Sequence, residues 1–143
     1  MSNFKEIIKI GQLEIRFLLD GDDTNNQMVV FEFIVPAGAK VPVAHYHVDV
    51  DEMVYGLEGT ITSYVDGKRI DTAPGGSCFI PRGAVHYHDN HTDDTVKVLC
   101  VLTPASIGPT YFRELNAVIQ AGGPPDPKKM AEVMLRHGLV PAV

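Results

Sequence analysis

Short strand-like segments separated by turn residues fill the chain from residue 7 to residue 102, and this pattern restricts the possible folds more than any other feature. The clearest turn is Asp66-Gly67, a pair typical of the two-residue type I′ hairpin, between runs at 61–65 and 68–72. Further strands are expected at 13–19, 27–35, 53–57, 77–80 and 95–102. Because no helical period interrupts these segments, the sequence predicts an all-β sandwich or closed barrel.

After about residue 109 the period becomes helical. In 110–120 the apolar residues recur at helical spacing, at Phe112, Leu115, Val118 and Ile119. A second helix is predicted to begin at an N-cap, Asp126, with Pro127 in its first turn, and to end before Gly138. Its apolar stripe consists of Met130, Val133, Met134 and His137. We expect this stripe to pack against the outside of the barrel, although a methionine stripe could also line a ligand groove.

The length of 143 residues fits one domain over 1–143, with a barrel at about 27–105 and a helical extension at about 109–138. A formal net charge of −6 at pH 7 argues against nucleic-acid binding, which relies on a basic surface. The sequence shows neither the apolar run of a signal peptide nor a membrane-spanning stretch, so we expect a cytoplasmic protein. Cys78 and Cys100 lie in apolar runs and are interpreted as buried structural thiols.

The histidines are concentrated in one part of the chain, with five of the six between residues 45 and 91. His45 and His47 are two residues apart, so on a strand their imidazoles share one face. Glu52 precedes the expected strand 53–57 and could face them from a neighbouring strand, while His86 begins another strand. Three imidazoles and a carboxylate suit a divalent transition metal and leave positions open for water or substrate.

Taken singly, each of these residues has an ordinary explanation, and only their order and spacing change the interpretation. Gly38 is followed by His45, His47, Glu52 and Gly59, which resembles the first motif of the cupin superfamily. The second motif of that family, G-x5-P-x-G-x2-H-x3-N, is matched throughout by Gly75, Pro81, Gly83, His86 and Asn90. The first motif departs slightly, because six residues rather than five separate Gly38 from His45. The resemblance covers about residues 27 to 105.

The resemblance implies a cupin jelly-roll β-barrel, or double-stranded β-helix, with the C-terminal helices packed outside. It also implies one divalent transition metal, held by His45, His47, Glu52 and His86. Fe, Mn, Ni, Co, Cu and Zn all suit these ligands. The chain is similar to small single-domain bacterial cupins that resemble quercetin dioxygenase, which suggests a dioxygenase acting on a small enolic, phenolic or flavonol-like substrate. Glu52 would then be a ligand and a general base. The alternatives are a redox-neutral isomerase or lyase of a sugar or keto acid, and a cupin that binds a small ligand without turnover.

Other residues carry weaker predictions. His88 lies two residues after His86, so it could face the lumen as an acid-base group or lie at the rim. Asn90 is expected to cap a turn. Arg82 could bind an anionic substrate or be an ordinary exposed arginine. Phe31, Phe33 and Phe79 could line a pocket or belong to the core.

A homodimer is also expected. The apolar residues that precede the barrel need a place to be buried; they are Phe4, Ile7, Ile8 and Ile10. The resemblance also implies a dimer, because small cupins commonly pair through their N-terminal strands. In the competing interpretation, the N-terminal strand folds back onto its own barrel and leaves a monomer.

Overall fold

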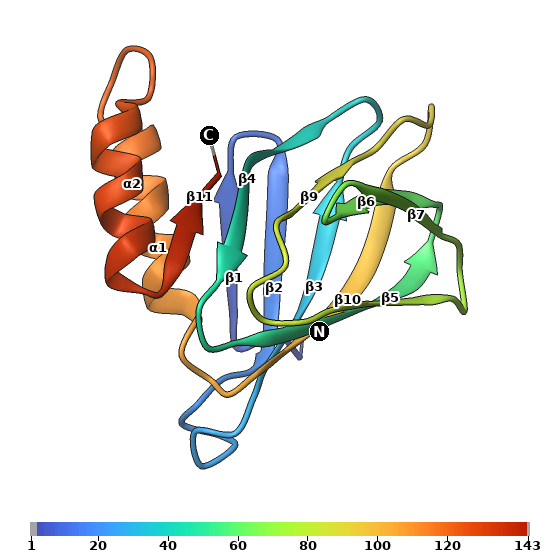
Figure 1. Cartoon of the computed structure of the whole chain (residues 1–143), viewed down its shortest axis with the longest axis horizontal. Coiled ribbons are helices and arrows are strands. Elements are labelled where there is room, and N and C mark those ends of the chain that lie inside the picture. Colours follow the sequence, from blue (N-terminus) through green and yellow to red (C-terminus); the bar gives the residue numbers. More distant parts are fainter. Residues whose placement is uncertain (1–2, 143) are drawn as a thin grey trace.

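The computed structural model describes residues 3–142, whose strands form two antiparallel sheets that face each other (Figure 1). In order across the first sheet, the strands are β1 (Glu6–Ile10), β2 (Leu13–Leu19), β3 (Val29–Val35), β10 (Val96–Thr103), β5 (Asp51–Glu58) and β8 (Ser77–Ile80). Across the second sheet they are β11 (Leu139–Pro141), β4 (Lys40–His47), β9 (His86–Asp89), β6 (Ile61–Val65) and β7 (Lys68–Thr72). This is the predicted jelly roll.

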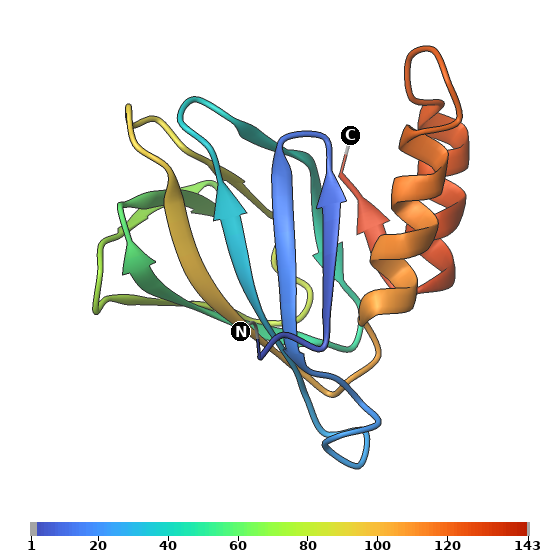
Figure 2. The same ribbon diagram turned by 180° about the vertical axis from the view of Figure 1, so that it is seen from behind.

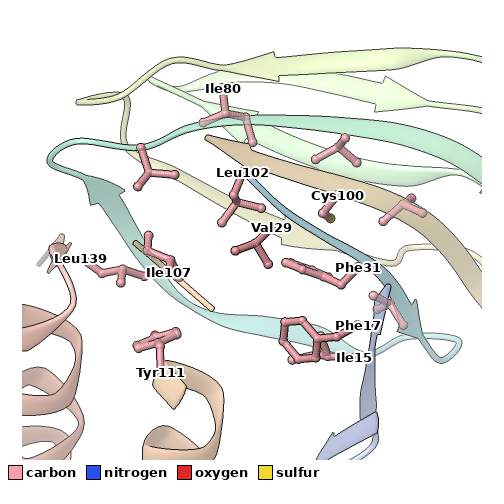
Figure 3. Packing of buried hydrophobic residues seen from close by; sticks show 14 of the residues in the cluster. Ile15, Phe17, Val29, Phe31, Ile80, Cys100, Leu102, Ile107, Tyr111 and Leu139 are labelled. Atoms are coloured by element: carbon pink, nitrogen blue, oxygen red, sulfur yellow. The ribbon is translucent and has the colours of Figure 1, made fainter. Parts of the chain in front are cut away.

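Alternation along the strands builds the core between the sheets. In β10 every second residue from Val96 is buried, and each residue between them is only half-buried. Phe17 of β2 and Phe31 of β3 meet inside the barrel with ring centroids 5.4 Å apart (Figure 3). The predicted hairpin between β6 and β7 is confirmed, since Asp66 and Gly67 both have the positive φ of a type I′ turn, 50° and 81°.

The two C-terminal helices are α1 (Pro109–Ile119) and α2 (Pro127–Arg136). Asp126 caps α2 as predicted, because its carboxylate accepts the backbone N–H of Lys128 at 2.9 Å. The helices lie outside the two sheets, with α1 against β1 and α2 against β11 (Figures 1 and 2). Since β1 and β11 are edge strands of different sheets, the helical pair bridges the open side of the barrel rather than covering an outer sheet face.

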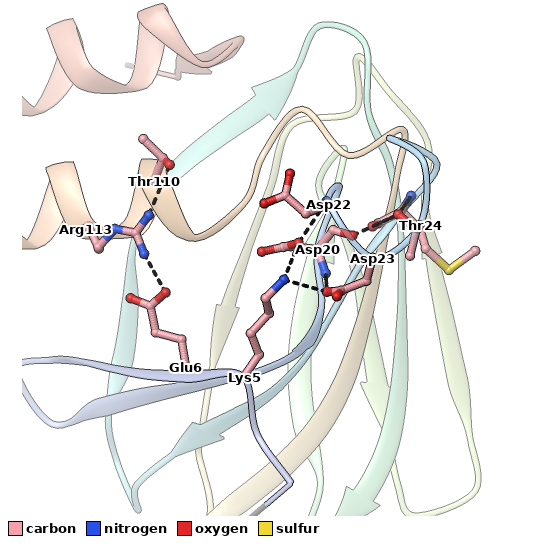
Figure 4. A network of polar contacts seen from close by, with 9 residues as sticks. Lys5, Glu6, Asp20, Asp22, Asp23, Thr24, Thr110 and Arg113 are labelled. Carbon is pink, nitrogen blue, oxygen red and sulfur yellow. Dashed lines mark hydrogen bonds and ion pairs between the residues drawn. The ribbon is translucent and has the colours of Figure 1, made fainter.

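Phe112 anchors this helical pair to the first sheet. Its ring centroid lies 5.7 Å from that of Phe17 and 5.6 Å from that of Phe31. A second attachment is the ion pair between Arg113 of α1 and Glu6 of β1 (Figure 4). Aromatic packing on the inner side and a charged pair on the outer side therefore hold α1 at the edge of the sheet.

Strand β1 folds back onto its own barrel. It pairs with β2 from Glu6 to Ile10, and Ile8 is buried within the chain. Just before it, Lys5 contacts Asp20 and Asp23, each at 2.8 Å (Figure 4). This is the arrangement of the competing, monomeric interpretation, and it removes one of the two arguments for a dimer. The homodimer remains a prediction. Among residues 3–142, no helix is long and apolar enough to cross a membrane.

Candidate metal centre

Three histidines from two neighbouring strands of the second sheet come together inside the barrel. His45 and His47 lie on β4, and His86 lies on β9 directly opposite His45 in the register. One nitrogen from each ring lies within 4.8 Å of the others. The Nε2 atoms of His45 and His47 are 3.1 Å apart. The spacing of two residues on a strand thus places both imidazoles on the inner face, as predicted.

Hydrogen bonds to the backbone orient two of these rings. Nδ1–H of His45 donates to the carbonyl oxygen of Val43 at 2.6 Å, and Nδ1–H of His86 donates to that of Ala84 at 2.9 Å. This arrangement places the proton on Nδ1 and leaves the lone pair of Nε2 facing the cluster. Metal-ligating histidines in proteins use this same device to fix the ring and its tautomer. The three residues therefore fit a divalent transition metal.

The protein environment keeps these imidazoles neutral. Burial, followed by the proximity of His86, lowers the pKa of His45 to about 4. Burial, followed by the proximity of His86 and His45, lowers the pKa of His47 to about 3. The pKa of His86 is also lowered, again mainly by burial. Neutral imidazole is the form that binds a metal, so protons compete little for these nitrogens near pH 7.

Glu52 reaches the cluster from the opposite sheet. It lies on β5, in the first sheet, whereas the sequence pattern suggested a strand next to the one that carries His45 and His47. Glu52 is nevertheless close to the histidines, because the two sheets of the barrel face each other here. Its Oε1 lies 4.0 Å from Nε2 of His47 and 3.9 Å from Nε2 of His86. The group in which all ligand atoms lie within 4.8 Å of one another consists of the histidines alone. Burial raises the pKa of Glu52 to about 7.

His88 faces the lumen beside Glu52. Of the two positions considered from the sequence, the lumen and the rim, the structure shows the lumen. Its Nε2 lies 3.9 Å from Oε2 of Glu52, and its Nδ1 is hydrogen-bonded to Oγ of buried Ser63 at 2.8 Å. Burial lowers the pKa of His88 to about 3. The serine hydroxyl fixes the ring, so His88 is held next to the carboxylate without belonging to the three-histidine group.

The glycine and proline positions of the second motif hold His86 in place. The backbone N–H of Gly83 donates to the carbonyl oxygen of His47 at 2.8 Å, which ties the turn to the strand that carries the other histidines. Gly83 has a φ of 85°, a value that glycine adopts without strain. Asn90 closes the far end of β9, because its Nδ2 donates to three backbone carbonyls, including that of Val35 at 3.0 Å. Its predicted role as a turn cap is thus what the structure shows.

A cavity of about 900 Å³ extends from the histidines to the helices. Phe31 and Phe33 line it, whereas Phe79 points outward with 61% of its surface exposed. Arg82 is not among the lining residues, since its guanidinium pairs with Asp51 on the protein surface, at 3.1 and 3.2 Å. A volume of this size is typical of sites for small organic molecules.

The helical wall of the cavity is the part of the site that the sequence pattern did not predict. Its lining residues on α1 and α2 include Tyr111, Phe112, Leu115, Met130 and Met134. The methionine stripe was the available signal, but it was interpreted first as packing on the outside of the barrel. In the structure Met130 and Met134 line the cavity, because α2 stands at the open side between β1 and β11. Val133 and His137 of the same stripe are not among the lining residues.

The lining of the cavity is mainly apolar, and its histidines and its carboxylate are clustered at one end. Among the lining side chains that the structure describes, none is lysine or arginine. The carboxylate of Glu52 is the acidic one, and it stands at the histidine cluster with His88. The cavity therefore offers a metal-ligating end and an apolar body, and its described side chains supply no fixed positive charge to pair with an anion.

Comparison with known proteins identifies the family. The cupin domain family matches residues 31–102, about half of the chain. The chain is 35% identical to quercetin 2,3-dioxygenase of Bacillus subtilis over 96 residues, which are 66% of this chain and 27% of that protein.

Two solved structures are also similar. A sugar phosphate isomerase of the cupin superfamily from Silicibacter pomeroyi is 30% identical, with a TM-score of 0.56, over 64% of this chain and 59% of its own. A predicted oxalate decarboxylase from Thermotoga maritima is 25% identical, with a TM-score of 0.62, over 73% of this chain and 89% of its own. The chain thus spans only about a quarter of the dioxygenase and three fifths of the isomerase. The shared fold and the match over half of its length place this chain in the cupin family.

Proposed function

We propose that the protein is a metal-dependent dioxygenase that acts on a small, uncharged and largely apolar enol or phenol. The observation that carries this proposal is the chemistry of the cavity: a ligand cluster at one end and an apolar lining that contains no described lysine or arginine. Such a cavity favours a substrate that presents one ionisable hydroxyl to the cluster and an apolar body to the walls. The similarity to quercetin 2,3-dioxygenase over two thirds of this chain supports the same reaction class.

In this proposal, His45, His47, Glu52 and His86 hold one divalent transition metal, which would supply Lewis-acid and redox chemistry when bound. Glu52 takes the proton from the substrate hydroxyl. Its raised pKa, about 7, lets it accept that proton near neutral pH and hold it within the cavity. His88, whose Nε2 lies 3.9 Å from Oε2 of Glu52, is the neighbouring acid-base group in this proposal. The apolar walls exclude water from the site.

A redox-neutral isomerase is the second candidate, favoured by the 30% identity to a sugar phosphate isomerase. A phosphorylated sugar carries two negative charges and many hydroxyls, and proteins bind such groups with arginine, lysine or exposed backbone N–H groups. The described lining of this cavity has no such cation. This difference is why we place the dioxygenase first and the isomerase or lyase second, with binding alone as a third outcome.

Oxygen consumption tests the proposal. Protein reconstituted with Fe, Mn or Ni is offered a panel of enols, catechols and flavonols, and both oxygen uptake and substrate loss are followed. Uptake that parallels substrate loss supports the dioxygenase; substrate loss without uptake supports an isomerase or lyase. Binding without turnover supports a ligand-binding cupin. Glu52→Gln should abolish turnover, whereas Glu58→Gln, on the same strand but exposed, should retain it.

A further inference from the structure

The helical side of the cavity contains a tyrosine hydroxyl for which the described residues provide no hydrogen-bond partner. Tyr111 of α1 lines the cavity and is 4% exposed. Its ring packs against Phe112, with centroids 4.9 Å apart, and against His137, at 5.4 Å. Within residues 3–142 its hydroxyl makes no hydrogen bond. The hydroxyl is not among the fully buried polar atoms that lack a partner, so it is reached from the cavity, where a bound molecule can accept its hydrogen bond.

The surroundings of Tyr111 restrict what that partner can be. Figure 3 shows its ring beside Ile107 and Leu139, at the junction of α1 with the barrel. Burial raises the pKa of Tyr111, so the hydroxyl remains protonated and can donate. The adjoining helical lining is apolar and includes Met130 and Met134. A neutral acceptor oxygen on an otherwise apolar molecule therefore matches this region.

We propose that Tyr111 is a second polar anchor for the substrate: its hydroxyl donates a hydrogen bond to a neutral oxygen, while another oxygen of the same molecule reaches the histidine cluster. This inference rests on the proposed function and narrows its substrate class. The substrate is an uncharged, largely apolar molecule with two separated oxygen functions, one ionisable and one a hydrogen-bond acceptor. Met130 and Met134 contact the apolar body between them, so the helical pair determines which enols or phenols fit.

Probe binding to the zinc-loaded full chain tests the anchor without turnover. The probes are 3-hydroxyflavone, which carries the enol, and its 2′-, 3′- and 4′-methoxy derivatives, each of which adds one acceptor oxygen. At least one derivative should bind more tightly than the parent compound. Tyr111→Phe should remove that advantage, a loss of about three- to tenfold for one neutral hydrogen bond. Tyr87→Phe is the matched control, because Tyr87 is exposed on the outer face and stacks on Tyr64.

Methionine methyl NMR on the same samples reports where the probes lie. The signals of Met130 and Met134 should shift on titration. Those of Met28, half-buried just before β3, and Met53, on the outer face of β5, should not, because neither lines the cavity. Probes that bind without moving Met130 and Met134, or a Tyr111→Phe variant that retains the preference for the methoxy derivative, would overturn the anchor and leave the dioxygenase proposal standing. If the zinc-loaded protein binds none of the four probes, the enol-binding function itself fails, and the anchor with it.

Discussion

Replacing Glu52 by glutamine should stabilise the metal-free protein at alkaline pH, although it removes an expected metal ligand. Burial raises the pKa of Glu52 from 4.5 to about 7. Between pH 4.5 and 7 the carboxyl group is ionised in the unfolded chain and protonated in the folded one. The free energy of unfolding therefore falls as the pH rises through this window. At about 1.4 kcal/mol for each pKa unit, the penalty reaches about 3 kcal/mol at pH 8 and is below about 1 kcal/mol at pH 5.

Urea and thermal unfolding of metal-stripped protein at pH 5 and pH 8 measure this penalty. At pH 8 Glu52→Gln should unfold with a free energy about 3 kcal/mol higher than the wild type, or about 10 °C higher in Tm. At pH 5 the two proteins should be nearly equal. His45 and His47 are neutral in the folded state at both pH values, because their pKa values are lowered to about 4 and 3. Their contribution therefore cancels in the comparison.

The control is Glu58→Gln on the same strand, whose exposed carboxylate should give little change at either pH. Saturating metal should reverse the order at pH 8, since it stabilises the wild type by mass action and binds the variant weakly. A Glu52→Gln variant that is less stable than the wild type at pH 8, or equally stabilised at both pH values, would refute the reasoning. Either result would mean that burial does not hold this carboxyl group in its protonated form.

Three further predictions concern the metal and the assembly. His86→Ala should lose at least about tenfold in metal affinity, measured by competition with a coloured chelator, while His91→Ala in an exposed loop should not. Metal affinity should rise from pH 5 to about pH 7 and then level off, because the metal must displace the proton of Glu52; a flat profile would exclude this residue as a ligand. Light scattering should give a dimer, and Phe79→Glu on the exposed outer face should weaken it; a wild-type mass near 15.6 kDa would reject the dimer.

The local parts of the fold could be predicted from the sequence. The β6–β7 hairpin follows from Asp66-Gly67 alone, because the positive φ angles that this pair tolerates suit a two-residue turn. The inward face of β4 follows from the spacing of His45 and His47. The start of α2 follows from Asp126, because its carboxylate accepts the backbone N–H of Lys128, only two residues further along the chain. Each of these features depends on neighbours in the chain.

The long-range parts could not be predicted in this way. Which sheet carries Glu52, and which side of the barrel the helices close, depend on pairings between residues far apart in sequence. Periodicity shows that α2 has an apolar face, but it does not show whether that face meets a sheet or a cavity. For the same reason the position of Tyr111 in the cavity wall becomes visible only when α1 is placed in space.

Strand β11 has a consequence for how the chain can be handled in the laboratory. It lies against β4 with Leu139 opposite His47 and Pro141 opposite His45, so the end of the described chain covers the strand that carries two of the expected ligands. Without 139–142, the backbone N–H and C=O groups of β4 would form an open sheet edge, the kind of surface that templates aggregation. A fused tag or a protease site is therefore better tolerated before β1 than close behind β11. Fraying of β11 would uncover this edge of β4 and make His45 and His47 more mobile.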